Sequence, residues 1–130
     1  YVVNQVSKLM IKKRIHIVDA NVLIMGLTFK ENCPDLRNSC VVDLITGFES
    51  FNCNVDVYDP WVSKKEANEL YGISLVSKPL NGKYDAIVLA VGHNEFTKMS
   101  EDQLRKLGRK NHVLYDIKYI LNVDEADGRL

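Results

Sequence analysis

The stretch Val22–Ser39, VLIMGLTFKENCPDLRNS, decides how this chain folds. It starts with an apolar run that has the length and composition of a buried strand. Gly26 then opens a polar loop, and a new amphipathic segment begins near Asn38. The order strand, loop, helix is typical of a parallel α/β sheet, in which ligands bind at the carboxyl ends of the strands. Because Lys30 and Arg37 lie on this loop, we expect an anionic ligand there, and phosphate is the simplest choice.

Hydrophobic periodicity predicts that helices and strands alternate along the rest of the chain. Helical spacing and capping residues predict helices over residues 2–12, from Asn38 or Ser39 to Phe51, over 63–71 with Gly72 at the stop position, and over 100–108. Apolar runs predict further strands at 55–58, 73–76, 86–91 and 113–117, of which 86–91 is apolar enough to be buried on both faces. We expect the polar tail, Asn122 to Leu130, to fray. The fold class is therefore an open, mostly parallel, Rossmann-like three-layer α/β sheet with helices on both faces.

Composition narrows the classes of function. The 130 residues suit one domain, and 17 basic against 17 acidic residues give zero formal charge. Without a global basic field we expect no nucleic acid and no membrane as partner, and no apolar run approaches the ~20 residues of a membrane span. Because the chain begins inside a predicted helix, without a starting Met, we expect it to be a piece of a longer protein.

The cysteines, Cys33, Cys40 and Cys53, are odd in number and lack metal-ligand spacing. Reduced thiols and no metal site are therefore expected. We interpret Cys40 and Cys53 as small buried hydrophobes, while Cys33 lies in the polar loop.

The glycine-rich fingerprint of a dinucleotide site is missing. After Gly26 the next glycine is Gly47, so backbone cannot approach a pyrophosphate closely along this loop. The side chains of Lys30 and Arg37 can hold a phosphate instead. The alternative is that both are solvated, or that they pair with acidic residues of their own loop, Glu31 and Asp35. Phe29 beside them is either a core residue or a surface on which a base stacks.

Polar residues also follow the other predicted strands. Asp59 either holds a ribose hydroxyl or simply forms a turn with Pro60. His93 is either a base or ligand contact, or a histidine bonded within its own loop. Lys118 follows the last predicted strand and is either solvated or on the same rim as Lys30. Since parallel strands share one carboxyl edge, we expect Lys30, His93 and Lys118 along one rim.

Five short motifs together resemble the C-terminal domain of the UDP-glucose/GDP-mannose dehydrogenase family. They are GLTFK at 26–30, DLRNS at 35–39, VYDP at 57–60, GHNEF at 92–96 and YDIK at 115–118. The resemblance covers nearly the whole chain in order, and Tyr1 to Val3 resembles the end of the long helix between that family's domains. The Glu-Asn pair after Lys30 and the Asp-x-Lys that ends at Lys118 are most similar to bacterial enzymes that act on UDP-N-acetylhexosamines.

The resemblance implies an oxidoreductase that converts a sugar C6 alcohol to a carboxylate in two NAD-dependent hydride transfers. The NAD fingerprint and the nucleophilic Cys of that family lie in segments upstream of this chain, and none of its three cysteines matches the nucleophile. We therefore expect no catalytic residue here and an inactive fragment. The implied setting is cytoplasmic synthesis of surface-polysaccharide precursors.

The resemblance also implies roles for single residues. Phe29, Lys30 and Lys118 are placed in the UDP-sugar site, and Arg37 reaches NAD across a cleft between domains. His93 stays an open candidate. Residues 1–13 correspond to the end of the interdomain helix and 14–130 to the UDP-sugar-binding domain. The implied partners are the NAD-binding domain of the same protein and, through the long helix, a second copy.

Two other interpretations remain open. The chain can be a stand-alone module that binds a nucleotide or nucleotide sugar without catalysis. It can also be an interaction domain in which the loop cations form surface pairs only. The sequence does not identify the sugar.

Overall fold

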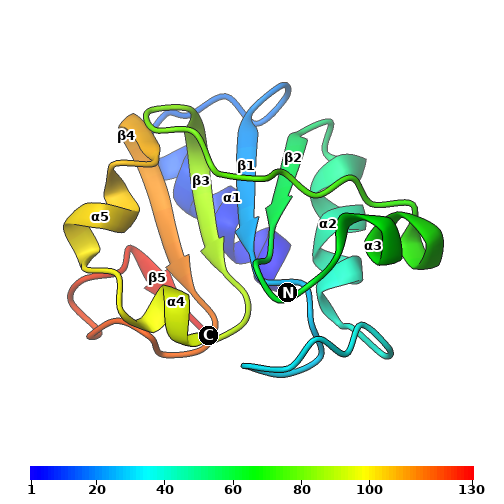
Figure 1. Ribbon diagram of the computed structural model, residues 1–130. Helices are drawn as coiled ribbons and strands as arrows, with labels where there is room; N and C mark the ends of the chain where they lie inside the picture. The colour runs from blue at the N-terminus through cyan, green and yellow to red at the C-terminus, as the bar shows by residue number, and fades with distance from the viewer.

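The computed structural model describes residues 1–130 and has an all-parallel sheet at its centre (Figure 1). The five strands lie in the order β2-β1-β3-β4-β5. Their bounds are β1 Asn21–Met25, β2 Asn54–Tyr58, β3 Tyr84–Leu89, β4 Gly108–Asp116 and β5 Gly128–Arg129. The helices are α1 Val2–Lys12, α2 Val41–Ser50, α3 Lys64–Tyr71, α4 Asn94–Thr97 and α5 Glu101–Arg105. The predicted parallel α/β class is confirmed.

The sheet buries both of its faces, because side chains alternate along each strand. In β1, Val22 and Ile24 pack into one core cluster, and Leu23 and Met25 into another. The first cluster also takes residues of α1 and α2, and the second takes residues of α4 and α5. Figure 1 accordingly shows α1 behind the sheet and α4 and α5 in front of it. All six residues of β3 are buried, as the apolar run 86–91 predicts.

Helix α1 belongs to the same core as the sheet. Val6 and Met10 are completely buried in the cluster that contains Val22 and Ile24. The N-terminus and the C-terminus both lie near the carboxyl edge of the sheet in Figure 1. Whatever is joined to Tyr1 therefore starts at the edge where ligands of such sheets bind.

The predicted caps of two helices are confirmed. Ser63 accepts the backbone N–H of Glu66 at the start of α3, and Gly72 ends that helix in the left-handed conformation. Ser100 and Gln103 form a capping box at the start of α5, although that helix ends at Arg105, before Gly108.

The predicted cap of α2 is wrong. Cys40, not Asn38 or Ser39, occupies the N-cap position. Asn38 has a left-handed φ of 59°, which is a loop conformation. The hydroxyl of Ser39 donates to the Leu27 carbonyl and accepts the Val41 N–H, so it ties the loop to the helix.

Two other predictions need correction. Residues 73–76 form only an isolated bridge, between Val57 and Leu75, and not a strand. The C-terminal tail does not fray, because Gly128 and Arg129 add strand β5 to the edge of β4. Asp127 secures this tail: its carboxylate accepts the Leu114 N–H at 2.7 Å. Helix α4 and the early start of β4 at Gly108 are elements that periodicity did not predict.

Candidate ligand-binding site

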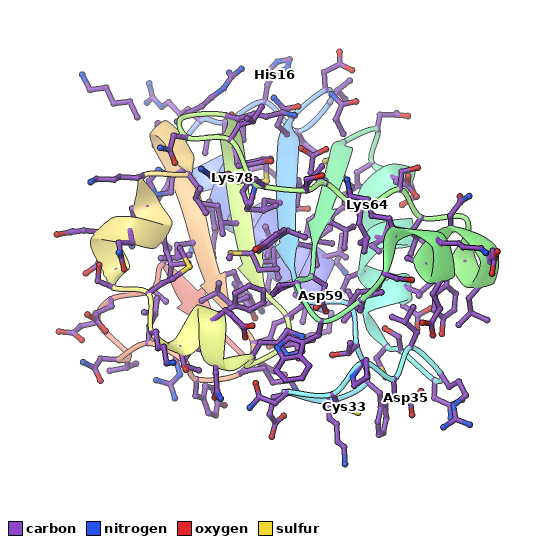
Figure 2. All side chains as sticks on the ribbon, viewed as in Figure 1. His16, Cys33, Asp35, Asp59, Lys64 and Lys78 are labelled. Atoms are coloured by element: carbon purple, nitrogen blue, oxygen red, sulfur yellow. The ribbon has the colours of Figure 1, made fainter.

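The carboxyl ends of β1 and β3 form a topological switch point. The two strands are hydrogen-bonded neighbours, but the chain leaves β1 toward β2 on one side and β3 toward β4 on the other. The loops therefore diverge and leave a crevice, which is where open α/β sheets bind ligands. Figure 2 shows Asp59 at this edge, next to the loop that carries Cys33 and Asp35, with His16 at the opposite edge.

A cleft of about 440 Å³ lies at this switch point. Residues from the start of α1, the loop after β1, the start of α2 and the ends of β3 and β4 line it. They are Val2, Thr28, Phe29, Lys30, Cys40, Val41, Leu44, Ala90, Val91, Ile117 and Lys118. The structure thus brings together Phe29, Lys30 and Lys118, and confirms that the two lysines lie on one rim.

The cleft combines an apolar lining with cations. Lys30 is exposed, and neither its ammonium group nor that of Lys118 forms an ion pair. Phe29 is 56% exposed, so it is not a core residue. An amphipathic anion, with one apolar end and one charged end, fits such a lining.

Arg37 lies outside this cleft. Its guanidinium forms a bidentate pair with Asp35, with Nε 3.0 Å from Oδ1 and Nη2 3.2 Å from Oδ2. The hydrogen bonds from Arg37 hold the pKa of Asp35 below its usual value. Arg37 therefore pairs with an acidic residue of its own loop, which was one of the two alternatives for its role. Glu31, the other acidic residue of the loop, forms no ion pair.

His93 is completely buried and has partners on both ring nitrogens. Nδ1 accepts the backbone N–H of Asn32 at 2.9 Å. Nε2 lies 3.0 Å from Asp59 Oδ2 and 3.2 Å from Thr28 Oγ1. Because Nδ1 is an acceptor, these bonds assign the proton to Nε2. His93 lies at the predicted edge but does not line the cleft, and its ring bonds to other loops and not within its own.

Asp59 is only 4% exposed and binds backbone as well as His93. Its carboxylate accepts the N–H groups of Leu27 at 2.7 Å, Thr28 at 3.2 Å and Trp61 at 2.8 Å. Burial raises the pKa of Asp59, but these bonds outweigh burial and leave the pKa below its usual value. The carboxylate is buried and all of its partners belong to the protein, so Asp59 does not hold a ribose hydroxyl in this structure. Asp59 also does more than form a turn with Pro60, because it binds the loop after β1 and His93.

Several contacts of this region were not predicted, although Asn32 and Asn94 lie in segments that carry the family resemblance. Asn32 and Asn94 bond to each other reciprocally, at 3.1 Å through Asn94 Oδ1 and at 2.8 Å through Asn94 N–H. Trp61 stacks on His93 with ring centroids 5.8 Å apart, and its Nε1–H donates to Glu95 at 2.9 Å. Only the meeting of separate loops in space reveals these contacts.

The cysteine predictions are partly wrong. Cys53 is buried as expected, but Cys40 is exposed, because it is the N-cap of α2 and lines the cleft. Cys33 is partly exposed, as its polar loop predicts.

A second charged cleft lies at the amino edge of the sheet. It contains Arg14 and Arg109, but also Asp19 and Asp85, so its cations are offset by carboxylates. Arg109 Nη1 lies 3.8 Å from Asp85 Oδ1. The carboxyl edge is therefore the better site for an anion. The chain has no cluster of His, Cys, Asp and Glu that could hold a metal ion, and none of its helices has the length and hydropathy of a membrane span.

Comparison with known proteins shows the family to which the chain is similar. Residues 23–123 match the model of the UDP binding domain of the UDP-glucose/GDP-mannose dehydrogenase family. The whole chain is 55% identical to a UDP-N-acetyl-D-glucosamine 6-dehydrogenase of Pseudomonas aeruginosa and 46% identical to one of Salmonella typhi. It spans 31% of the length of each of these relatives. A UDP-D-ManNAc dehydrogenase from Pyrococcus horikoshii shares the fold, with a TM-score of 0.78 at 20% identity over 98% of this chain and 29% of that one.

Proposed function

The chain belongs to the UDP-glucose/GDP-mannose dehydrogenase family, and on this basis we propose that its cleft binds the UDP portion of a nucleotide sugar. The observation that carries the proposal is the pair of lysines, Lys30 and Lys118, on the rim of an apolar cleft at the switch point. Their ammonium groups neutralise the diphosphate as point charges. Phe29 and the apolar lining take the less polar part of the nucleotide.

We further propose that this domain is part of an NAD-dependent UDP-sugar 6-dehydrogenase. Two NAD molecules in succession would each accept one hydride, and a water would supply the second oxygen, as the sugar C6 alcohol becomes a carboxylate. The residues of this chain bind and orient the UDP-sugar and close the cleft, and they supply no covalent chemistry. The substrate class is a UDP-N-acetylhexosamine, which is supported by the names of the two relatives that match the entire chain.

The position of the N-terminus supports a site shared between domains. Val2 lines the cleft, so a domain joined through α1 would start beside the bound UDP-sugar. We propose residues 1–13 as the end of the interdomain helix and 14–130 as the UDP-sugar-binding domain. We propose further that two copies of the full protein pair through that helix. The full protein would act in the cytoplasm, in the synthesis of polysaccharide precursors.

Arg37 is proposed to reach the NAD held by the other domain. Its side chain is 82% exposed, and its pairing with Asp35 is a surface ion pair of low stability. The guanidinium can therefore exchange Asp35 for a phosphate of the cofactor when the domains close.

Calorimetric titration of this chain with UDP and, in parallel, with uridine tests the proposal. We expect one saturable UDP site and much weaker binding of uridine, because uridine lacks the charges that the lysines neutralise. A chain that binds neither compound, or binds both equally, would refute the proposed site. The same protein, incubated with NAD and UDP-N-acetylglucosamine, should form no NADH.

A further inference from the structure

One buried imidazole holds the loop on both sides of Lys30. On one side, His93 Nδ1 accepts the Asn32 N–H at 2.9 Å. On the other side, His93 Nε2 lies 3.2 Å from the hydroxyl of Thr28, and this hydroxyl donates to the Lys30 carbonyl at 2.9 Å. The backbone of Lys30 is thus fixed at both ends, while its ammonium group is free to bind a ligand.

We propose that His93 is a positioning residue for UDP binding, which acts by holding the Lys30 loop in its binding conformation. This rests on the proposed function of the cleft. His93 does not line the cleft and so does not touch the ligand itself. By ordering the loop beforehand, His93 lowers the entropic cost that the loop would otherwise add when Lys30 binds a phosphate.

The conformation of Asn32 is held by neighbouring groups. Its φ of 54° is left-handed, which costs less for Asn than for most other residues with a side chain. Asn32 is held by its N–H bond to His93 and by the reciprocal side-chain pair with Asn94. Loss of the His93 acceptor leaves the Asn94 pair alone to hold this turn.

The imidazole is itself rigidly held. Asp59 Oδ2 binds Nε2 at 3.0 Å, and the ring of Trp61 stacks on it. The same carboxylate accepts the N–H groups of Leu27 and Thr28, where the loop begins. Asp59 and His93 therefore secure the loop from β1 to Asn32 as one unit.

Two substitutions of His93 separate its two bonds. His93→Asn keeps an acceptor close to the position of Nδ1, so it can still bind the Asn32 N–H. His93→Gln keeps a donor close to the position of Nε2, so it can still bind Asp59 but loses the acceptor. Both variants lose the ring that stacks on Trp61, which makes each the matched control of the other.

The measurement is the UDP dissociation constant of both variants, with intact Lys30 and with Lys30→Ala. We expect His93→Gln to raise the constant about threefold to tenfold and His93→Asn to raise it less than twofold. With Lys30→Ala the two variants should bind UDP equally, because positioning has no effect once the lysine is gone. A general structural defect would weaken binding by the same factor in both backgrounds.

A ligand-free readout separates this inference from the proposed function. Hydrogen exchange of the Asn32 amide should be faster in His93→Gln than in His93→Asn. If either His93 variant does not fold, Asn94→Ala, an exposed substitution, should weaken UDP binding about twofold to fivefold with Lys30 and not with Lys30→Ala. Failure of the unaltered chain to bind UDP would refute the proposed function. Equal amide exchange, or a difference in affinity that persists with Lys30→Ala, would refute the positioning role alone.

Discussion

His93 Nε2 lies 3.0 Å from Asp59 Oδ2, and both residues are buried although they follow different strands. His93 follows β3 and Asp59 follows β2, with β1 between those two strands in the sheet. The pair thus spans the carboxyl edge below β1 and secures the loop that leaves this strand. Loss of this pair should therefore lower the stability of the fold and also weaken binding at the ligand site.

Stability should fall on acidification. The pKa of Asp59 is lower in the folded chain than its ordinary value of about 3.9, so the ionised carboxylate stabilises the folded state. This contribution is complete above that value and is lost as the pH falls through the folded-state pKa. Urea denaturation of Asp59→Asn should give a free energy of unfolding about 2–3 kcal/mol lower at pH 7. The loss of stability between pH 5 and 3 should also be smaller in this variant.

Glu49→Gln is the control for that experiment, since Glu49 is exposed and forms no side-chain hydrogen bond. It should change the free energy of unfolding by less than about 0.5 kcal/mol. If Asp59→Asn has the same free energy of unfolding as this control at pH 7, and loses as much stability between pH 5 and 3, the carboxylate does not support the loop as described.

Gly26 should tolerate no side chain. Its φ is 104°, and a Cβ there would lie 2.5 Å from Val91 Cβ and 2.9 Å from the Val91 backbone N. Gly26→Ala should therefore lower the free energy of unfolding by about 3 kcal/mol and weaken UDP binding, because the loop must move away from Val91, which follows β3. Gly82 also has a positive φ, but a Cβ there meets nothing within 4 Å. Gly82→Ala should cost only about 1 kcal/mol, and equal thermal stability of the two variants would contradict this explanation.

The sheet and the position of the cleft could both be predicted from the sequence, because both follow from recognising buried parallel strands. A continuous apolar run such as 86–91 indicates a strand buried on both faces, and parallel strands end at one edge. Lys30 and Lys118 therefore had to lie on a common rim, and they do. What could not be predicted is which loops meet there, because the bond between His93 and Asn32 depends on the three-dimensional paths of both loops.

The ordered C-terminus escaped prediction because charged groups from distant segments hold it. Arg105 Nη1 and Lys13 Nζ both lie 3.2 Å from Asp127 Oδ2. A polar tail without periodicity contains no sign of these partners. Exposure of Cys40 was missed because free cysteines are usually buried, whereas this one lies at the N-cap of α2.

Asp127 should matter more than its place near the end of the chain suggests. Asp127→Ala removes the partner of Arg105 and of the Leu114 N–H, and should lower the free energy of unfolding by about 2–3 kcal/mol. Asp124→Ala, three residues earlier, removes an exposed carboxylate without such bonds and should have an effect below about 0.5 kcal/mol. Denaturation curves that coincide for the two variants would show that the tail does not contribute.

Arg37 should act on the cofactor. In the full-length protein, Arg37→Ala should weaken NAD binding and leave binary UDP-sugar affinity nearly unchanged, because Arg37 lies outside the cleft. Arg37→Lys should restore only part of the NAD affinity, since an ammonium lacks the planar bidentate fork. Separate titrations with each ligand decide. Loss of UDP-sugar affinity with unchanged NAD affinity would place Arg37 in the substrate site instead.

The most direct test of the account is the UDP dissociation constant of Lys30→Ala, measured by calorimetry on the folded variant. Loss of one charge-assisted contact to phosphate should raise it by about 10- to 150-fold. Lys65→Ala is the matched control, because Lys65 is an exposed lysine on α3 that pairs only with Glu69. The account predicts a large increase for Lys30→Ala and none for Lys65→Ala. A dissociation constant for Lys30→Ala within about twofold of the unaltered chain would contradict it.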